Sequence, residues 1–251
     1  FKIKPDYVIH CGNKVFGIGG NKKNQFRMLN DNLIMNSNLI KSISETKLKK
    51  FVCIGSTAVY SDKLKRKLNE NDIFFDKPHS SEYYYGLSKR IMLEQLNILK
   101  KDKNIPFIYI VMNNLYGPRD NFNTSNGHVV PSLIHKCIIA KKKSKSLEVW
   151  GNKNNKRFLL YSHDAANAII TMLKNNFDGV INLGSKHEYS INDLVNYITK
   201  ILSFKGKTHW IDANVKAVNR REISLNKIRK LKFKENVSLD EGLKNTIDWL
   251  K

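Results

Sequence analysis

Residues 51–60 read Phe-Val-Cys-Ile-Gly-Ser-Thr-Ala-Val-Tyr, four apolar residues followed at once by a glycine and two hydroxyl side chains. A short apolar run that ends in turn residues is typical of a strand buried on both faces of a parallel sheet. In open parallel sheets, ligands bind where the strands end. We therefore expect Ser56 at the ligand-binding edge of such a sheet.

Apolar runs and helical periodicities alternate on both sides of this stretch. The runs predict further strands at residues 7–10, 106–112, 147–150 and 180–183. The periodicities and capping residues predict helices at 26–44, 82–100, 129–142, 165–173, 190–202 and 238–250. This alternation predicts an α/β fold with a Rossmann-like, doubly wound parallel sheet, covered on both faces.

The alternation weakens after Met112, where the predicted loops lengthen, so we expect a smaller α/β substrate lobe. The predicted cofactor domain comprises residues 1–113 with about 159–185, without its first βα units. The predicted substrate lobe comprises residues 114–158 with 186–251.

The net charge of +22 raises the possibility of a nucleic-acid ligand. However, the excess consists of 36 scattered lysines that accompany 30 asparagines, which is typical of an AT-rich genome and a solvated surface. We therefore expect small anions such as nucleotide phosphates, no nucleic acid and no metal site. The three cysteines form no closely spaced pair, which favours a reducing cytoplasm, and no apolar run reaches the roughly 18 residues of a membrane span.

The first chemical signal is Tyr85-Gly-Leu-Ser-Lys89, which places a phenol and an ammonium on one face of a helix. A nearby ammonium favours the phenolate, so the pair can exchange a proton with a carbonyl or alcohol oxygen. Such spacing is common by chance in a chain with 10 tyrosines and 36 lysines. It gains weight because Ser56, at a strand end 29 residues earlier, can contact the same oxygen.

Ser56, Tyr85 and Lys89, together with the segment Ile110-Val-Met-Asn-Asn-Leu-Tyr-Gly-Pro118, resemble the extended short-chain dehydrogenase/reductase superfamily. Within it, the stretch 114–131 (Asn-Leu-Tyr-Gly-Pro-Arg-Asp-Asn-Phe-Asn-Thr-Ser-Asn-Gly-His-Val-Val-Pro) is similar to the GDP-L-fucose synthase family. Enzymes of that family are NADPH-dependent 3,5-epimerase/4-reductases of GDP-4-keto-6-deoxymannose. The resemblance extends through the whole chain.

The resemblance implies a role for each matching residue. Tyr85 is the implied acid/base with Lys89 as its partner, Ser56 binds the 4-oxygen, and His128 is the acid in epimerisation. The implied NADP-binding residues are Ile54, Gly55, Ser56, Thr57, Tyr85, Lys89, Met112, Asn113, Asn114, Leu115 and His128. The implied substrate-binding residues are Asn114, Lys136, Trp150, Arg157 and Arg221.

The sequence departs from the family pattern at two functional positions. Residues 17–20 do not form the glycine-rich turn G-x-G-x-x-G, and the chain begins with Phe1, so we expect the natural protein to continue upstream. The family's base for epimerisation, a cysteine two residues after the serine, is Ala58 here, and an acidic residue of the C-terminal lobe is Lys216.

Three functions remain open at this point. The first is an NADPH-dependent reductase of a GDP-linked 4-keto sugar, either a 6-deoxyhexose or a heptose, that serves surface-glycan synthesis. The second is the full epimerase/reductase with another base, and the third is a catalytically silent fragment or binding domain. For the enzyme we expect a cytoplasmic homodimer.

Overall fold

The central element of the fold is a parallel sheet of four strands, in a computed structural model that describes residues 4–16, 18–124, 127–211 and 221–251. Its order is β1-β2-β3-β7, with β1 at Tyr7–His10, β2 at Lys50–Ile54, β3 at Phe107–Met112 and β7 at Gly179–Leu183. All six residues of β3 are buried, as expected for a central strand covered on both faces. Each of these strands lies within one residue of its predicted bounds.

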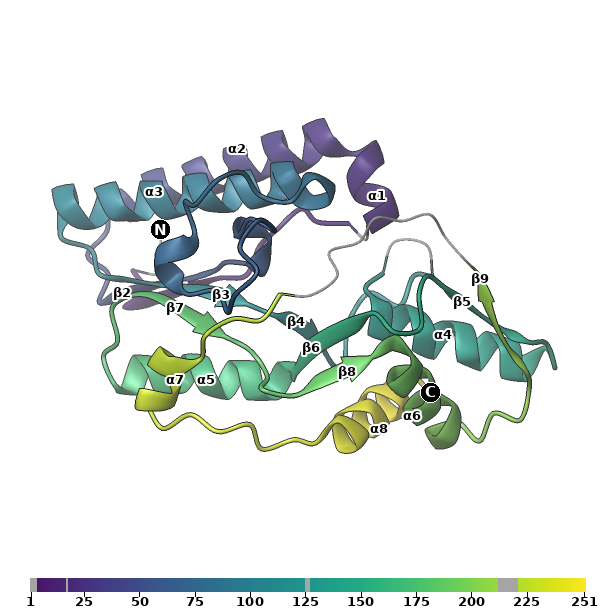
Figure 1. Cartoon of the computed structure of the whole chain (residues 1–251). Helices are drawn as coiled ribbons and strands as arrows, with labels where there is room; N and C mark the ends of the chain where they lie inside the picture. Colours follow the sequence, from purple (N-terminus) through teal and green to yellow (C-terminus); the bar gives the residue numbers. More distant parts are fainter. Residues whose placement is uncertain (1–3, 17, 125–126, 212–220) are drawn as a thin grey trace.

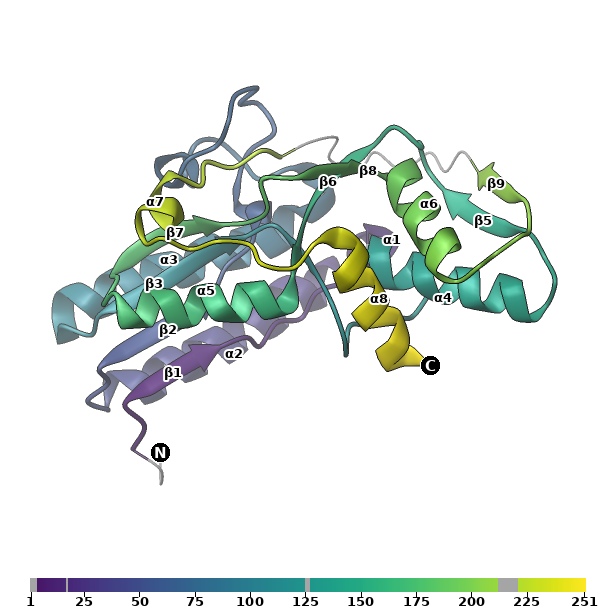
Figure 2. The same cartoon turned by 90° about the horizontal axis from the view of Figure 1, so that it is seen from below.

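Helices cover both faces of this sheet (Figures 1 and 2). The pair α2 (Gln25–Ser44) and α3 (Tyr83–Lys103) lies on one face, and α5 (Ser162–Lys174) with the short α7 (Asn226–Lys230) lies on the other. The prediction of a Rossmann-like, doubly wound parallel sheet is therefore confirmed. The helix α3 ends where Asn104 adopts the left-handed conformation, with φ of 55°.

Two smaller sheets lie beyond the ends of the central strands. One has the order β4-β6-β8, with β4 (Asn114–Tyr116) parallel to β6 (Lys156–Tyr161) and β8 (Glu188–Ser190) antiparallel to it. The other pairs β5 (Leu147–Trp150) with β9 (Thr208–Ile211). The helices α4 (Val129–Lys142), α6 (Ile191–Ile201) and α8 (Leu239–Leu250) pack around them.

The sequence did not predict β4, β6, β8, β9 or the helices α1 (Ile18–Lys23) and α7. The strands β4 and β8 have three residues each, too few to show a period, and β6 opens with the charged pair Lys156-Arg157. The helix α5 begins three residues before its predicted start. Among the described residues, no helix combines the length and apolar composition needed to cross a bilayer.

Buried apolar side chains form two large clusters. One fills the space between the central sheet and its helices, and the other lies among α4, α6, α8 and the small sheets. The first cluster also takes in Ile223, Leu225 and Ile228, from the segment that returns to the central sheet at α7. The division into a cofactor domain and a substrate lobe at the residues given above stays a prediction.

Candidate active site

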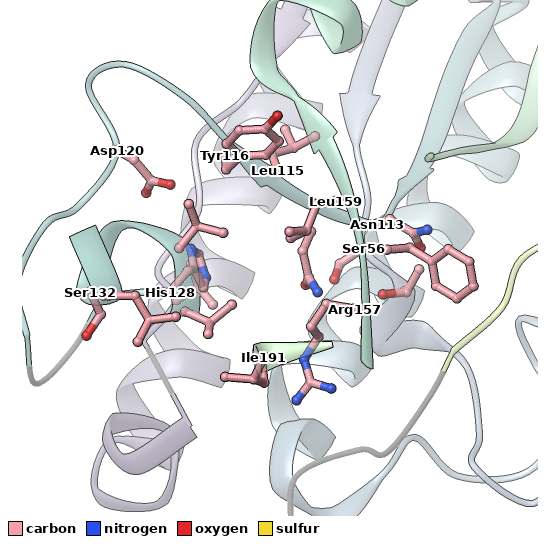
Figure 3. A pocket seen from close by; sticks show the side chains of 18 of the residues that line it. Ser56, Asn113, Leu115, Tyr116, Asp120, His128, Ser132, Arg157, Leu159 and Ile191 are labelled. Carbon is pink, nitrogen blue, oxygen red and sulfur yellow. The ribbon is translucent and has the colours of Figure 1, made fainter. Parts of the chain in front are cut away.

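A cavity of about 700 Å³ opens where β2 and β3 end and extends toward β5, β6 and α4. Figure 3 shows Ser56 and Asn113 on one side of it and His128 and Ser132 on the other. The structure brings together all but one of the predicted site residues as lining of this cavity: Ile54, Gly55, Ser56, Thr57, Tyr85, Met112, Asn113, Asn114, Leu115, His128, Lys136, Trp150, Arg157 and Arg221. The exception is Lys89, which lies outside the lining.

Ser56 caps a short 3-10 turn, η1 (Thr57–Val59), immediately after β2. Its hydroxyl accepts a hydrogen bond of 3.1 Å from the Ala58 amide, so its own proton can still be donated into the cavity. Gly55 is required beneath it, because a Cβ there would lie 2.6 Å from the Tyr109 ring. The turn therefore holds the hydroxyl at the strand end, as the sequence predicted.

Tyr85 lies in the first turns of α3 and is 9% exposed. Burial raises the pKa of its phenol, and the nearby Glu82 carboxylate raises it further, while a hydrogen-bonding contact with Ser56 acts in the opposite direction. Gly86 lets α3 approach η1 closely, since a Cβ at this position would collide with the Ala58 carbonyl oxygen. The phenol is consequently held beside Ser56 in its protonated form at neutral pH.

Lys89 is 1% exposed and is not part of the cavity lining. Its ammonium donates a hydrogen bond of 2.5 Å to the Ile54 carbonyl oxygen and lies 5.7 Å from the centre of the Tyr85 ring. Burial lowers the pKa of Lys89, an effect that the neighbouring thiols of Cys53 and Cys11 oppose. The predicted contact of Lys89 with a ribose remains a prediction.

The loop that leaves β3 forms the wall next to Ser56. The Asn113 amide nitrogen donates to the Leu183 carbonyl oxygen at 3.0 Å, while the side-chain Nδ2 is buried without a partner. Gly184 accommodates that side chain, because a Cβ on Gly184 would lie 2.5 Å from Nδ2. An unsatisfied buried donor at a strand end suits a carbonyl-bearing ligand such as the carboxamide of a nicotinamide.

The cations Lys136, Arg157 and Arg221 also line the cavity. The Lys136 ammonium lies 3.9 Å from the centre of the Trp150 ring, and burial lowers the pKa of Lys136 although Glu148 opposes the shift. Burial also lowers the pKa of Arg157. The negative charge of Glu82 opposes this shift, and the positive charge of Arg221 adds to it. Positive groups removed from water in this way favour an anionic ligand.

Arg221 reaches the cavity from the C-terminal part of the chain. Its Nη1 donates to the Glu82 carboxylate at 2.5 Å, and its Nε and Nη2 are buried without a partner. Two unsatisfied guanidinium donors match the spacing of phosphate or carboxylate oxygens.

His128 and Ala58 complete the set of positions that the resemblance singles out. His128 is exposed immediately before α4, across the cavity from Ser56 (Figure 3). Ala58 is 1% exposed, packs with Met28 and Tyr85, and is not part of the cavity lining. Lys216 lies outside the described residues.

Sequence reasoning missed several lining residues, among them Phe16, Asn21, Ser81, Glu82 and Asp120. Of these residues, Glu82 was the one that the sequence could have indicated, because its carboxylate lies three positions before Tyr85. Its partner Arg221 lies 139 residues further along the chain, so no local pattern could reveal the pair.

Comparisons with known proteins place these features in one context. The sequence profile of the NAD dependent epimerase/dehydratase family matches residues 1–184. A GDP-L-fucose synthase of Dictyostelium discoideum is 33% identical over 211 residues, which are 82% of this chain and 65% of that protein. The match thus spans slightly less than two thirds of that relative's length.

Two further proteins show the same similarity over nearly the whole chain. A GDP-L-colitose synthase of Yersinia pseudotuberculosis is 28% identical over 253 residues, covering 98% of this chain and 81% of that one. The crystal structure of a GDP-L-fucose synthetase from Naegleria fowleri bound to NADP is 27% identical, covers 98% of this chain and 77% of that one, and has a TM-score of 0.87.

Proposed function

The chain belongs to the NAD dependent epimerase/dehydratase family, and on that premise we propose that it is an NADPH-dependent reductase of a GDP-linked 4-keto sugar, similar to GDP-L-fucose synthase and serving nucleotide-sugar synthesis for surface glycans. The observation on which the proposal depends is one cavity lined both by Ser56 and Tyr85 and by the partly buried cations Lys136, Arg157 and Arg221. The hydroxyl groups suit the ketone and the cations suit the diphosphate of one substrate.

The described residues fit a nicotinamide at the ends of β2 and β3, where Asn113 has its unsatisfied donor. The residues that would hold NADP(H) there are Ser56, Thr57 and the loop from Met112 to Leu115. When bound, NADPH supplies the hydride that the C4 carbon of the sugar accepts.

Tyr85 gives its proton to the 4-oxygen as the ketone becomes an alcohol. Burial keeps the phenol protonated before this step, which is the form that a general acid needs. Ser56 donates a hydrogen bond to the same oxygen and so orients the carbonyl. The Lys89 ammonium, 5.7 Å from the centre of the Tyr85 ring, favours the phenolate that remains, because a nearby positive charge stabilises the ionised form.

Trp150, Arg157, Lys136 and Arg221 bind the nucleotide part of the substrate. An arginine holds a phosphate through two parallel hydrogen bonds, whereas a lysine offers a point charge. The family's arginine at the position of Lys136 is thus replaced by a group that keeps the charge and loses the planar fork. Asn114 contacts the sugar, a role that its exposure at the start of β4 and its position in the cavity lining support.

The reaction is reduction without epimerisation. Removing a proton beside the ketone needs a base, and Ala58 offers a buried methyl group that packs against Met28. His128 is the acid for the opposite face, but it has no matched base at the family's position. Hydride transfer to C4 needs neither group. The full 3,5-epimerase/4-reductase is the second candidate, and a silent binding domain is the third.

One experiment separates these three functions. The protein is incubated with NADPH and GDP-4-keto-6-deoxymannose in D₂O, and both NADPH loss and product deuteration are measured. The proposal expects NADPH loss and no deuterium at C3 or C5. Deuterium at either carbon would establish the bifunctional enzyme, and unchanged NADPH with intact substrate would favour the binding domain.

We further propose that the protein is a cytoplasmic homodimer. Its three cysteines are free thiols, which supports a reducing compartment. Apolar side chains are exposed on the outer faces of α2 and α3, with Phe26 at 78%, Ile34 at 54% and Ile98 at 58% exposure. Sedimentation equilibrium of the wild type and of Ile98→Glu tests this interface, and a wild-type monomer would rule it out.

A further inference from the structure

One wall of the cavity is polar. It consists of Asn21 from α1 and Ser81 and Glu82 from the 3-10 turn η3 (Ser80–Glu82), and all three residues line the cavity that contains Ser56 and Tyr85. We propose that Asn21 and Glu82 bind the hydroxyl groups on C2 and C3 of the sugar ring, so that the protein selects a 4-keto sugar with both hydroxyls over its 3-deoxy analogue. This inference rests on the proposed function.

Asn21 has hydrogen-bonding capacity that the protein leaves unused. The residue is 4% exposed, its Nδ2 reaches the Ser81 carbonyl oxygen at 3.5 Å, and its Oδ1 is buried without a partner. Either orientation of this amide leaves one polar atom unsatisfied. A buried polar group without a partner destabilises the protein, because it has lost its hydrogen bonds to water. A ligand hydroxyl, which both donates and accepts, would remove this cost.

Glu82 adds a carboxylate to the same wall. Arg221 Nη1 donates to Oε2, which leaves further acceptor positions on the two oxygens for ligand hydroxyl protons. The side chain of Glu82 is 28% exposed and that of Arg221 is 10% exposed, so the pair is largely shielded from water. The pair thus presents acceptors from Glu82 beside the unsatisfied donors of Arg221.

The position of Glu82 determines which edge of the sugar it meets. Glu82 contacts Arg221, which is proposed to bind the diphosphate. Glu82 also lies three residues before Tyr85, the proposed proton donor to O4. A pyranose ring joins its C1 phosphate to its C4 ketone along two edges. One edge carries the C2 and C3 hydroxyls, and the other carries the ring oxygen and the C5 substituent. A wall of carboxylate and amide groups complements the hydroxylated edge.

Apolar side chains elsewhere in the cavity suit the remaining edge. Val130, Leu133 and Ile191 line it from α4 and α6, and they can pack against a methyl group on C5. Sites built to hydrogen-bond a hydroxyl reject analogues that lack it much more strongly than apolar sites reject an added group. The selectivity therefore resides in Asn21 and Glu82.

The test compares two ketones that differ at one carbon. kcat/KM for reduction is measured with GDP-4-keto-6-deoxymannose and with its 3-deoxy analogue, for the wild type, Glu82→Gln, Asn21→Leu and the control Glu94→Gln, an exposed residue of the helix α3 that follows Glu82. We expect the wild type and Glu94→Gln to prefer the hydroxylated ketone. Each wall variant should lose about 10- to 100-fold with that ketone and much less with the analogue.

If the wall has only a structural role, Glu82→Gln and Asn21→Leu should lower kcat/KM equally with both ketones, and that result would overturn the inference. Equal kcat/KM values of the wild type for the two ketones would also overturn it. Binding of GDP-mannose and GDP-3-deoxymannose to the same proteins is measured by calorimetry. This measurement tests the wall even if neither ketone is reduced, an outcome that would remove only the proposed function. Equal affinities for the two nucleotides in the wild type would again refute the role of Asn21 and Glu82.

Discussion

At the scale of single residues, the chemistry of the site depends on how burial sets the protonation of Tyr85. The phenol is enclosed, close to the Glu82 carboxylate, and its pKa is raised by both. A protonated phenol beside the Ser56 hydroxyl can donate its proton to a substrate oxygen that becomes basic during the reaction. The direction of the proposed reaction, from ketone to alcohol, therefore matches the state in which the protein holds this side chain.

Replacing Tyr85 by phenylalanine removes the proton and keeps the ring. We expect Tyr85→Phe to lower kcat for ketone reduction by about 10²- to 10⁴-fold, the usual contribution of a general acid, with unchanged affinity for GDP. Tyr84→Phe, next to it on α3, is the matched control. Unchanged turnover in Tyr85→Phe would show that another group protonates the oxygen.

Lys89 influences how readily Tyr85 loses this proton. In the reverse direction, alcohol oxidation, Tyr85 must first lose its proton, so the rate rises as pH passes the pKa of the phenol. The neighbouring ammonium favours the phenolate, and Lys89→Met should therefore move this rise to higher pH. A pH–rate profile of alcohol oxidation measures the shift, and a profile identical to that of the wild type would argue against this role.

Local sequence patterns were sufficient for some of these residues and insufficient for others. Ser56 directly follows a recognisable strand, and Tyr85 and Lys89 are four residues apart on one helix face. Each of these two patterns is therefore visible within a short stretch of sequence. The proposed roles of Asn21 and Glu82 depend on contacts between residues distant in the sequence, such as the hydrogen bond between Glu82 and Arg221. The position of Lys89 against the Ile54 carbonyl, outside the cavity lining, also depends on tertiary packing.

At the scale of helices and strands, the start of α6 connects local capping to the site. The Ser190 hydroxyl accepts from the Asp193 amide at 3.0 Å, and the Asp193 carboxylate accepts from the Ser190 amide at 2.8 Å, so the two residues form a capping box. The next residue, Ile191, donates to the Asn155 carbonyl oxygen at 2.9 Å and lines the cavity. The cap thus also fixes the loop that precedes Arg157.

Removing this cap should destabilise the protein. We expect Ser190→Ala to cost about 1 kcal/mol of unfolding free energy, measured by urea denaturation, with the exposed Ser146→Ala as control. The hydrogen bonds from Ser190 lower the pKa of Asp193, so its contribution is complete above about pH 4, the usual aspartate value, and is lost as pH falls through the lowered folded value. A full effect that persists in strong acid would contradict this account of the cap.

The long elements were predictable because their periodicity is internal. The helix α4 and the strand β5 have the predicted bounds, and the central-sheet strands β1, β2, β3 and β7 were found from apolar runs, although the edge strand β1 is partly exposed. The strands β4 and β8 were missed because three residues are too few to show a period, and β6 was missed although its apolar run, Phe158 to Tyr161, is buried, because a charged pair precedes it. Since β4 and β6 line the cavity, the errors fall on the part of the fold that shapes the substrate site.

At the scale of the whole molecule, the cavity joins segments that are distant in the chain. Its cations come from α4, β6 and the segment around Arg221, whereas its acid comes from α3. A ligand that contacts all of these binds the folded protein and not the unfolded chain. Ligand binding should therefore stabilise the entire fold.

We expect GDP at 100 times its Kd to stabilise the wild type by about 2.7 kcal/mol, seen as a rise in Tm. Arg157→Gln should reduce this rise at the same GDP concentration, because a half-buried partner for phosphate is lost. Arg229→Gln, on the exposed side of α7, is the charge-matched control. An undiminished rise in Arg157→Gln would place the diphosphate elsewhere.

The stacking of Lys136 over Trp150 gives this protein an optical reporter. Indole emission responds to the electric field around the ring, and here a positive charge lies 3.9 Å from its centre. An anionic nucleotide that draws the ammonium away would change the colour and yield of that emission. Of the three tryptophans, Trp150 is the one on the cavity wall, while Trp249 stacks on Phe122 with ring centres 5.9 Å apart. The difference in fluorescence between the wild type and Trp150→Phe would therefore follow nucleotide entry in real time, without a label.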